Sequence, residues 1–149
     1  ANKVSLVQKV NAYFGDDLKG MKFALWGLAF KPETDDIREA PSIYIINELI
    51  KAGAQIIAFD PEANTNVQNT LGNKIEYAEN AYDALQGVDS LLIATEWAAF
   101  RNPDFSKMKS IMKNPIIFDG RNLFDLYSME KRGFYYQSIG RRTINNLNK

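Results

Sequence analysis

The chain has 149 residues, 46% of them hydrophobic, and its 18 lysines and arginines balance its 18 aspartates and glutamates. This length suits one domain with a single core, and the charge balance argues against nucleic acid or a membrane surface as a partner. No apolar run approaches the ~18 residues of a membrane span and no signal-peptide pattern begins the chain, so we expect a soluble, cytoplasmic protein.

The sequence contains no cysteine and no histidine. It therefore lacks a thiolate nucleophile, an imidazole base, a disulfide and the usual ligands of a zinc site. Catalysis would have to come from Asp, Glu, Lys, Ser, Thr or Tyr, a short list for a self-sufficient enzyme. This scarcity, and a first residue that is Ala1, favour a piece of a larger protein, although removal of an initiator methionine explains Ala1 equally well.

Residues 1–18 predict a separate helix, after which apolar runs alternate with helical patterns. Because the apolar runs are continuous and do not alternate with polar residues, they suit strands that are covered on both faces, as in a parallel sheet. The predicted strands are residues 22–30, 55–60, 90–97, 115–120 and 134–140, with a short extra strand at 74–79.

The segments between these runs predict helices at residues 42–52, 81–86, 104–112 and 124–131, and an exposed loop at residues 61–73. Pro41 suits the first turn of a helix, and Gly53 suits a C-terminal cap. The repeated β-α-β order predicts an α/β fold of the Rossmann-like, doubly wound kind. We expect a mostly parallel sheet of about five to six strands with helices on both faces.

The first strand is followed by an unusual loop. Ligands of open α/β sheets bind beyond the carboxyl ends of the strands, and a dinucleotide-binding first turn needs the pattern G-x-G-x-x-G. Here Gly27 is followed by Leu28, Ala29 and Phe30, so this fingerprint is absent. Lys31 stands there instead, held extended by the proline that follows it. Its ammonium group could meet an anionic ligand, or it could simply be solvated at the loop edge.

Two arginines at the strand ends have a functional and a structural interpretation. Arg38 lies within the charged segment after Lys31, where it could pair with an aspartate at residues 35–36. Arg121 could clamp a phosphate with two hydrogen bonds, or it could pair with Asp119 or Asp125.

Other residues at the strand ends also have a functional and a structural interpretation. Asp60 precedes a proline and is expected to form a turn rather than to bind a ribose. Thr95 and Glu96 could contact a ligand, whereas Trp97 is expected to pack under its loop. Gly120 permits a sharp turn.

Four stretches occur together in this sequence: "GLAFKPETDDIREAPS", "FDP", "ATEW" and "FDGRN". In order and spacing they resemble the C-terminal domain of the UDP-glucose/GDP-mannose dehydrogenase family, in particular its NAD-dependent members that oxidise UDP-glucose to UDP-glucuronate by two hydride transfers. The resemblance covers nearly the whole chain. Residues 1–18 resemble the end of the helix that joins the two halves of such an enzyme, and residues 19–149 resemble its UDP-sugar-binding domain.

The resemblance implies roles for matching positions. Phe30 and Lys31 would contact UDP-glucose or UDP, Arg121 would hold the same ligand, and Arg38 would reach an NAD that is bound mainly by the N-terminal domain of the same polypeptide. The charged loop after the first strand would then be where substrate and cofactor meet. The full-length enzyme would be a homo-oligomer.

This chain lacks the family's glycine-rich NAD loop and its catalytic cysteine. We therefore expect the isolated chain to bind the UDP moiety and to be inactive as a dehydrogenase. The GDP-mannose and UDP-N-acetylmannosamine dehydrogenases share the "GLAFK" and "DD-R" features, whereas "TEW" together with "DGRN" favours UDP-glucose. A non-catalytic receiver-like or oligomerisation module is the alternative from another class, although Asp35 and Asp36 lie too far past the strand for a receiver.

Overall fold

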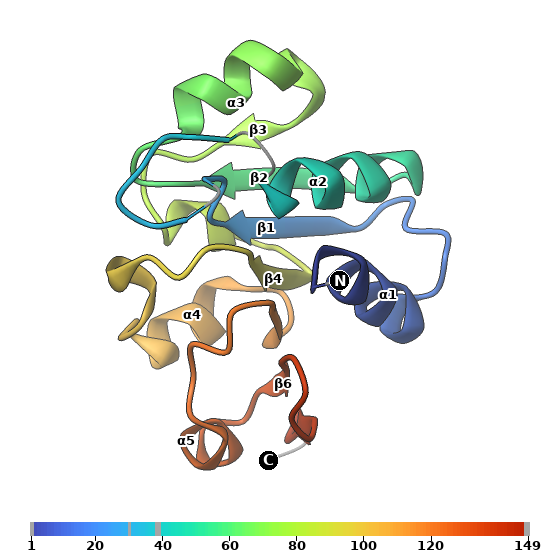
Figure 1. Ribbon diagram of the computed structural model, residues 1–149. Coiled ribbons are helices and arrows are strands. Elements are labelled where there is room, and N and C mark those ends of the chain that lie inside the picture. The colour runs from blue at the N-terminus through green and yellow to red at the C-terminus, as the bar shows by residue number, and fades with distance from the viewer. Residues whose placement is uncertain (1, 30, 38–39, 148–149) are drawn as a thin grey trace.

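A computed structural model describes residues 2–29, 31–37 and 40–147, the side chains of residues 2–5 excepted, as one seven-stranded sheet flanked by helices (Figure 1). The strand order is β3-β2-β1-β4-β5-β6-β7, and only the β6–β7 pair is antiparallel. The strands are β1 (Lys22–Trp26), β2 (Gln55–Phe59), β3 (Glu76–Tyr77), β4 (Ser90–Ile93), β5 (Ile116–Asp119), β6 (Tyr135–Gln137) and β7 (Ile144–Asn145). The chain builds outward from β1 to β3 and then returns to place β4 on the other side of β1, which is the doubly wound topology predicted from the sequence.

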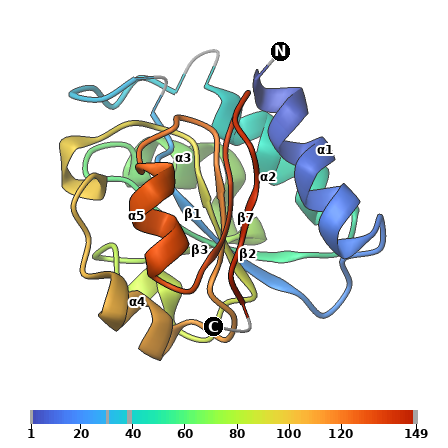
Figure 2. The same ribbon diagram turned by 90° about the horizontal axis from the view of Figure 1, so that it is seen from below.

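Helices cover both faces of this sheet, as Figure 2 shows. Helices α1 and α2 lie on one face, and α4 and α5 lie on the other. The central strands β4 and β5 are buried along their whole length, as their continuous apolar sequences predict. The helices are α1 (Asn2–Phe14), α2 (Pro41–Lys51), α3 (Asn64–Leu71), α4 (Phe105–Ile111) and α5 (Leu126–Lys131).

Helix α1 packs against α2 and β5. Its buried residues Leu6, Val7 and Val10 recur at helical spacing and join the core, and the ring of Phe14 meets that of Phe23 at 5.4 Å. The predicted helix near the N-terminus is therefore present and integrated with the domain. That residues 1–18 end an interdomain helix stays a prediction.

Helix α2 begins and ends within one residue of the predicted bounds, residues 42–52. Pro41 occupies the first helical turn, where its missing N–H costs no hydrogen bond. Gly53 follows the last turn with a φ of 100°, a conformation that residues with a Cβ adopt only at a cost. These two residues fix the length of the helix that follows the charged β1 loop.

Three local predictions differ from the structure. Residues 61–73 are not a loop but contain α3, because Val67 and Leu71 bury one side of an otherwise polar helix. Residues 81–86 form only a 3₁₀ turn, η2 (Asp83–Leu85), where the Asn80 side chain accepts a hydrogen bond from the N–H of Asp83. Strand β7 is a seventh strand that the sequence did not predict, because two residues are too few to carry a pattern.

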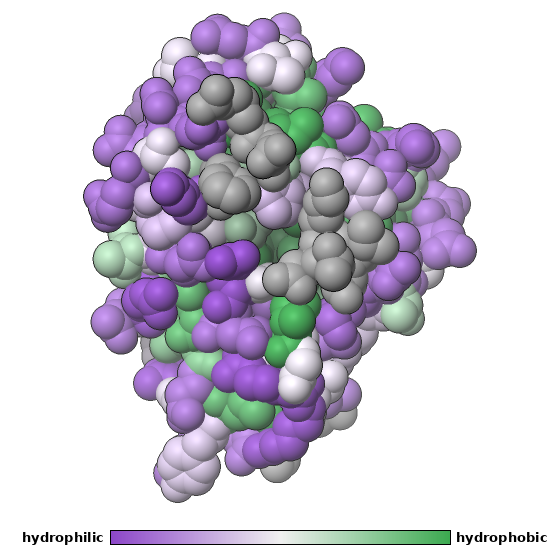
Figure 3. All heavy atoms as spheres, viewed as in Figure 1, coloured by the Kyte–Doolittle hydropathy of each residue, from purple (hydrophilic) through white to green (hydrophobic). Residues whose placement is uncertain are grey.

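The outer surface is mostly polar. The face in Figure 3 is largely hydrophilic with small apolar areas, and the exposed large hydrophobic side chains of the described residues are Tyr13 and Tyr127. No helix in the described part of the chain is long and apolar enough to cross a membrane. Within the same residues no group of His, Cys, Asp or Glu side chains could hold a metal ion.

The turn at the end of β1 is closed by Thr95, which follows β4. Gly27 has a φ of 100°, and a Cβ at this position would lie 2.6 Å from atoms of Thr95. The Thr95 hydroxyl in turn donates a 2.8 Å hydrogen bond to the carbonyl of Ala29. Strand β1 stops at Trp26 and β4 at Ile93, earlier than the predicted ends at residues 30 and 97. The contact between Gly27 and Thr95 lies just beyond both strands.

Replacing Gly27 with alanine should destabilise the fold through both its dihedral angle and the contact with Thr95. Gly87→Ala is the matched control, because Gly87 also has a positive φ of 69° but has open space where a Cβ would stand. We expect Gly27→Ala to lower the free energy of unfolding by about 1–3 kcal/mol more than Gly87→Ala, the usual cost of overpacking. Urea denaturation of both variants measures this difference, and equal losses would show that the close contact with Thr95 is unimportant.

Candidate functional site

Three loops follow the carboxyl ends of the central strands, where open α/β sheets bind ligands. They are the β1 loop (residues 27–40), the β4 loop (residues 94–104) and the β5 loop (residues 120–125). In Figure 1 the arrowheads of β1 and β2 point left, and the loops after β1 and β4 lie on that side. Lys31 in the β1 loop and Arg121 in the β5 loop are both exposed, so two of the predicted ligand-binding cations lie at the same edge of the sheet.

The β1 loop is held by the carboxylate of Asp60, which lies buried at the end of β2. Its Oδ2 accepts hydrogen bonds from the backbone N–H groups of Leu28 (2.7 Å) and Ala29 (2.9 Å). Its Oδ1 accepts from Glu62 (2.8 Å) and Ala63 (2.9 Å) at the start of the next turn. Asp60 is therefore a structural residue, as its Asp-Pro context predicts, and it joins the ends of two neighbouring strands.

This arrangement removes the features that a dinucleotide phosphate needs. A Rossmann turn offers free backbone N–H groups to the pyrophosphate, but here the N–H groups of Leu28 and Ala29 bind Asp60. The N–H of Gly27 donates to the carbonyl of Phe59, and Thr95 fills the space beside Gly27. The turn after β1 therefore does not fit the phosphates of NAD.

The β4 loop is fixed on two sides. Thr95 is buried and donates to the carbonyl of Ala29. Trp97 is buried and donates from Nε1 to Asp60 Oδ2 at 3.1 Å, which confirms that it packs under its loop. Between them, Glu96 is half-buried, and its Oε2 accepts a hydrogen bond from Arg121 Nε. The sequence left the roles of Thr95 and Glu96 open, and the structure gives Thr95 a structural one.

The ion-pair partners that the sequence suggests for the side chain of Arg121 are wrong. Its side chain pairs with Glu96 of the β4 loop rather than with Asp119 or Asp125. Asp119 instead binds the backbone, because its Oδ1 accepts from the N–H of Arg121 at 2.8 Å and its Oδ2 from the N–H of Leu123 at 2.7 Å. A partner 25 residues away in the sequence depends on strand order, which local spacing does not show.

The sharp turn of the β5 loop is made by Asn122, not by Gly120. Asn122 has a φ of 56°, and its side chain exchanges hydrogen bonds with Ile139, one to the carbonyl (3.0 Å) and one from the N–H (2.8 Å). Gly120 instead allows the β5 loop to lie close to the end of β4, since a Cβ at this position would lie 3.0 Å from the carbonyl oxygen of Ile93. Asparagine is among the residues that tolerate positive φ, so this signal was present in the sequence.

A buried network supports the β5 loop from below, and no pattern in the sequence indicated it. The hydroxyl of Tyr136 donates to Asp119 Oδ2 at 2.6 Å, and Arg141 Nη2 donates to the same hydroxyl at 2.9 Å. Burial first, then the negative charge of Asp119, raise the pKa of Tyr136 above its ordinary value. The hydroxyl therefore stays protonated and keeps donating to Asp119.

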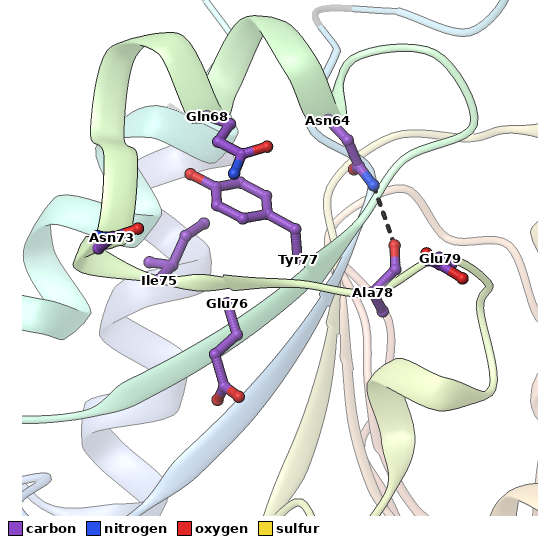
Figure 4. Close-up of a pocket in the computed structure, with 8 residues that line it drawn as sticks. All are labelled: Asn64, Gln68, Asn73, Ile75, Glu76, Tyr77, Ala78 and Glu79. Carbon is purple, nitrogen blue, oxygen red and sulfur yellow. Dashed lines mark hydrogen bonds between the residues drawn. The ribbon is translucent and has the colours of Figure 1, made fainter.

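A separate hollow of about 680 Å³ lies between α3 and β3 (Figure 4). In Figure 4 the ring of Tyr77 lies under α3, and Asn64 bonds the carbonyl of Ala78. Two carboxylates, Glu76 and Glu79, line the hollow, and no lysine or arginine is among its described lining residues. Because phosphates need cationic or N–H donors, this hollow is a poorer candidate for an anionic ligand than the edge that carries Lys31 and Arg121.

Residues 24–126 match the family described as UDP-glucose/GDP-mannose dehydrogenase family, UDP binding domain. The chain belongs to this family. A UDP-glucose 6-dehydrogenase of Pseudomonas aeruginosa is 41% identical over 144 residues, which cover 93% of this chain and 32% of that protein. The chain thus spans about a third of the length of the curated relatives it matches.

Two solved structures of nucleotide-sugar dehydrogenases have a similar fold. A UDP-glucose dehydrogenase from Pyrobaculum islandicum has a TM-score of 0.72 at 30% identity and covers 82% of this chain, which covers 26% of it. An NDP-N-acetyl-D-galactosaminuronic acid dehydrogenase from Methanosarcina mazei has a TM-score of 0.77 at 27% identity. The match covers 94% of this chain and 29% of that one.

Two of the predicted site residues, Phe30 and Arg38, lie outside the described residues, so their roles stay predictions.

Replacing Asp60 with asparagine should destabilise this domain strongly. The amide of asparagine carries N–H donors on one side, so it cannot accept from all five groups that Asp60 now binds. We expect the free energy of unfolding to fall by about 2–4 kcal/mol, because hydrogen bonds to a buried charged group contribute more than neutral ones. Chemical denaturation followed by circular dichroism measures this loss.

Asp104→Asn is the matched control, because Asp104 is the exposed N-cap of α4 and accepts from the N–H of Lys107. Asparagine and aspartate serve almost equally at an N-cap, so this variant should stay close to the wild type. If Asp60→Asn cost no more than Asp104→Asn, Asp60 would not be the residue that holds the β1 loop.

Proposed function

We propose that this chain is the C-terminal substrate-binding domain of an NAD-dependent UDP-glucose 6-dehydrogenase, a cytoplasmic homo-oligomer when full length. The full-length enzyme would convert UDP-glucose to UDP-glucuronate by two hydride transfers. The chain would bind the UDP moiety and complete an active site whose remaining groups lie in an N-terminal domain of the same polypeptide. Membership of the UDP-binding family argues against a receiver-like or oligomerisation module.

The observation that carries this proposal is the placement of Lys31 and Arg121 at one edge of the sheet. They follow β1 and β5, which are separated by β4 alone, so their loops begin roughly 10 Å apart at the usual strand spacing. Two long cationic side chains can converge on one diphosphate across that distance. The buried carboxylates that follow β2 and β5, Asp60 and Asp119, bind backbone N–H groups, and among the described residues neither pairs with the side chain of Lys31 or Arg121.

The chemistry of the reaction would come from elsewhere in the full-length enzyme. This chain has no cysteine and no histidine, and the N–H groups after β1 that would bind a dinucleotide phosphate are occupied by Asp60. NAD would therefore be bound mainly by the N-terminal domain, with Arg38 reaching it from this one. We expect no NADH formation from UDP-glucose and NAD by the isolated chain.

A second candidate function is the same role in a dehydrogenase of another nucleotide sugar. The similarity to the Methanosarcina mazei enzyme, at 27% identity over 94% of the chain, keeps this alternative open. Comparing UDP-glucose, UDP-N-acetylmannosamine and GDP-mannose as substrates of the full-length enzyme distinguishes the two candidates. A preference for either of the last two would overturn the assignment of glucose but not of the family.

UDP should perturb the backbone NMR signals of the β1 and β5 loops in this chain. Lys31→Ala and Arg121→Ala should each weaken UDP binding by about tenfold or more, since each removes a charge-assisted hydrogen bond. Lys109→Ala is the control, because Lys109 is an exposed lysine of α4 outside the three loops. Shifts that cluster elsewhere, for example around α3 and β3, would count against this site.

In the full-length enzyme, Arg38→Ala should raise the apparent KM for NAD and leave that for UDP-glucose nearly unchanged, whereas Lys31→Ala should do the reverse. The expected change for the affected ligand is about tenfold to a hundredfold, the effect of a lost charged hydrogen bond. Steady-state kinetics with melting curves test this. If Arg38 only pairs with a nearby aspartate, its loss should instead lower the Tm and weaken both ligands together.

A further inference from the structure

The segment formed by Thr95, Glu96 and Trp97 joins the loops that carry the two proposed substrate cations. Thr95 is bound to the β1 loop through the carbonyl of Ala29, and Trp97 is bound to Asp60, which holds the same loop. Both flanking side chains are buried. Because residues on either side are fixed, the carboxylate of Glu96 leaves a rigid backbone and reaches toward the β5 loop.

Arg121 has a fixed backbone and a long, exposed side chain. Its N–H binds Asp119, and the next residue, Asn122, is held on both sides by Ile139. Beyond this point the side chain has four rotatable bonds and one polar contact within the described part of the chain, from Nε to Glu96 Oε2. The orientation of the guanidinium group therefore depends on Glu96.

The nitrogen of Arg121 that Glu96 contacts determines which donors of the guanidinium group remain for a ligand. A guanidinium group is planar and carries its donors in a rigid fork, so a partner at Nε fixes the plane of the whole group. The other two nitrogens, Nη1 and Nη2, make no hydrogen bond to any described residue. These two nitrogens form an edge that can bind a carboxylate or a phosphate with two parallel hydrogen bonds, and the alternative edge, which includes Nε, is taken by Glu96.

We propose that Glu96 is a positioning residue for Arg121: it holds Nε so that Nη1 and Nη2 face the diphosphate of the nucleotide sugar. This inference rests on the proposed function, because it takes Arg121 as a ligand of the diphosphate. The ligand does not have to displace Glu96, since the two bind different edges of the guanidinium group. The side chains of Arg121 and Glu96 are 36% and 23% exposed, so the pair can be reached from solvent.

A competing role for Glu96 predicts the opposite sign. A carboxylate next to a phosphate site repels the phosphate, so a Glu96 that merely neutralised Arg121 would weaken UDP binding, and its removal would strengthen it. If Glu96 positions Arg121, its removal weakens UDP binding, because the guanidinium group must then be ordered when the ligand binds. The direction of the change therefore separates the two roles.

The test is UDP titration of this chain, followed by backbone NMR, for the wild type, Glu96→Ala and Glu96→Gln. We expect Glu96→Ala to weaken UDP binding by about two- to tenfold, the cost of ordering one long side chain. Glu96→Gln keeps an oxygen that accepts from Nε, so it should restore most of the affinity. Glu130→Ala is the matched control: it breaks a similar exposed pair, with Arg142, outside the three loops, and should leave UDP affinity unchanged.

The Arg121→Ala background shows whether Glu96 acts through Arg121. In that background, Glu96→Ala should have no further effect on UDP affinity. Uridine, which has no phosphate, should bind the wild type and Glu96→Ala equally. A Tm for Glu96→Ala close to that of the wild type would show that the loss of affinity is not a loss of folding.

Three results would overturn the proposal. Tighter UDP binding by both Glu96 variants would assign Glu96 the neutralising role, and equal binding by all three proteins would leave it no role in recognition. A further loss on adding Glu96→Ala to Arg121→Ala would mean that Glu96 acts by another route. If the wild-type chain did not bind UDP at all, the proposed function itself would fail, a result distinct from the other three.

Discussion

The carboxylate of Asp60 is the interaction on which the arrangement of the site depends. It is buried at the end of β2 and binds the β1 loop, the turn before α3 and the indole of Trp97 in the β4 loop. A buried carboxylate is stable only when its charge is met by hydrogen bonds, and here backbone and indole N–H groups meet it. Since three segments converge on one residue, the loops beyond the central strands take their shape together.

The same interaction explains why this Rossmann-like fold offers no dinucleotide cradle at its switch point. In a dinucleotide-binding domain, free N–H groups after β1 bind the pyrophosphate, and an acidic residue after β2 binds the ribose. Here the acidic residue and the N–H groups bind each other. The β1 loop is left to present its charged residues, beginning with Lys31, at the edge of the sheet. The strand order of a Rossmann-like fold is retained, but the N–H groups that would bind a phosphate are bound to Asp60 of the same chain.

The strands and the general fold could be predicted because they depend on local composition. Continuous apolar runs, Pro41 and Gly53 each act within a few residues, and the structure confirms what they predict. Helix α3 was missed because its helical face is only two residues wide, Val67 and Leu71. Tertiary burial, not an apolar stripe along its whole length, determines this helix.

In the candidate site, too, some features depend on local sequence and others on tertiary contacts. That Lys31 and Arg121 lie at one edge of the sheet follows from strand order, and the sequence predicts it. The partner of Arg121 could not be predicted, because Glu96 lies on a different strand end and nearer aspartates were available in the sequence. Asp119 does not pair with that side chain because backbone N–H groups and the hydroxyl of Tyr136 already bind it. A pairing across the sheet depends on which nearby acids are already bound to other groups, and spacing alone does not contain that information.

These contacts also determine where acidic and basic side chains lie at this edge of a chain with no net charge. Two of the acids at the carboxyl ends of the strands, Asp60 and Asp119, are turned inward, where N–H and O–H donors satisfy them. Their negative charge therefore lies below the loops, whereas Lys31 and Arg121 stand exposed above them. Glu33 and Asp35 of the β1 loop are exposed as well, so the edge carries charges of both signs. Glu96 differs from these acids because it contacts Arg121 directly, so it can both orient that side chain and offset its charge.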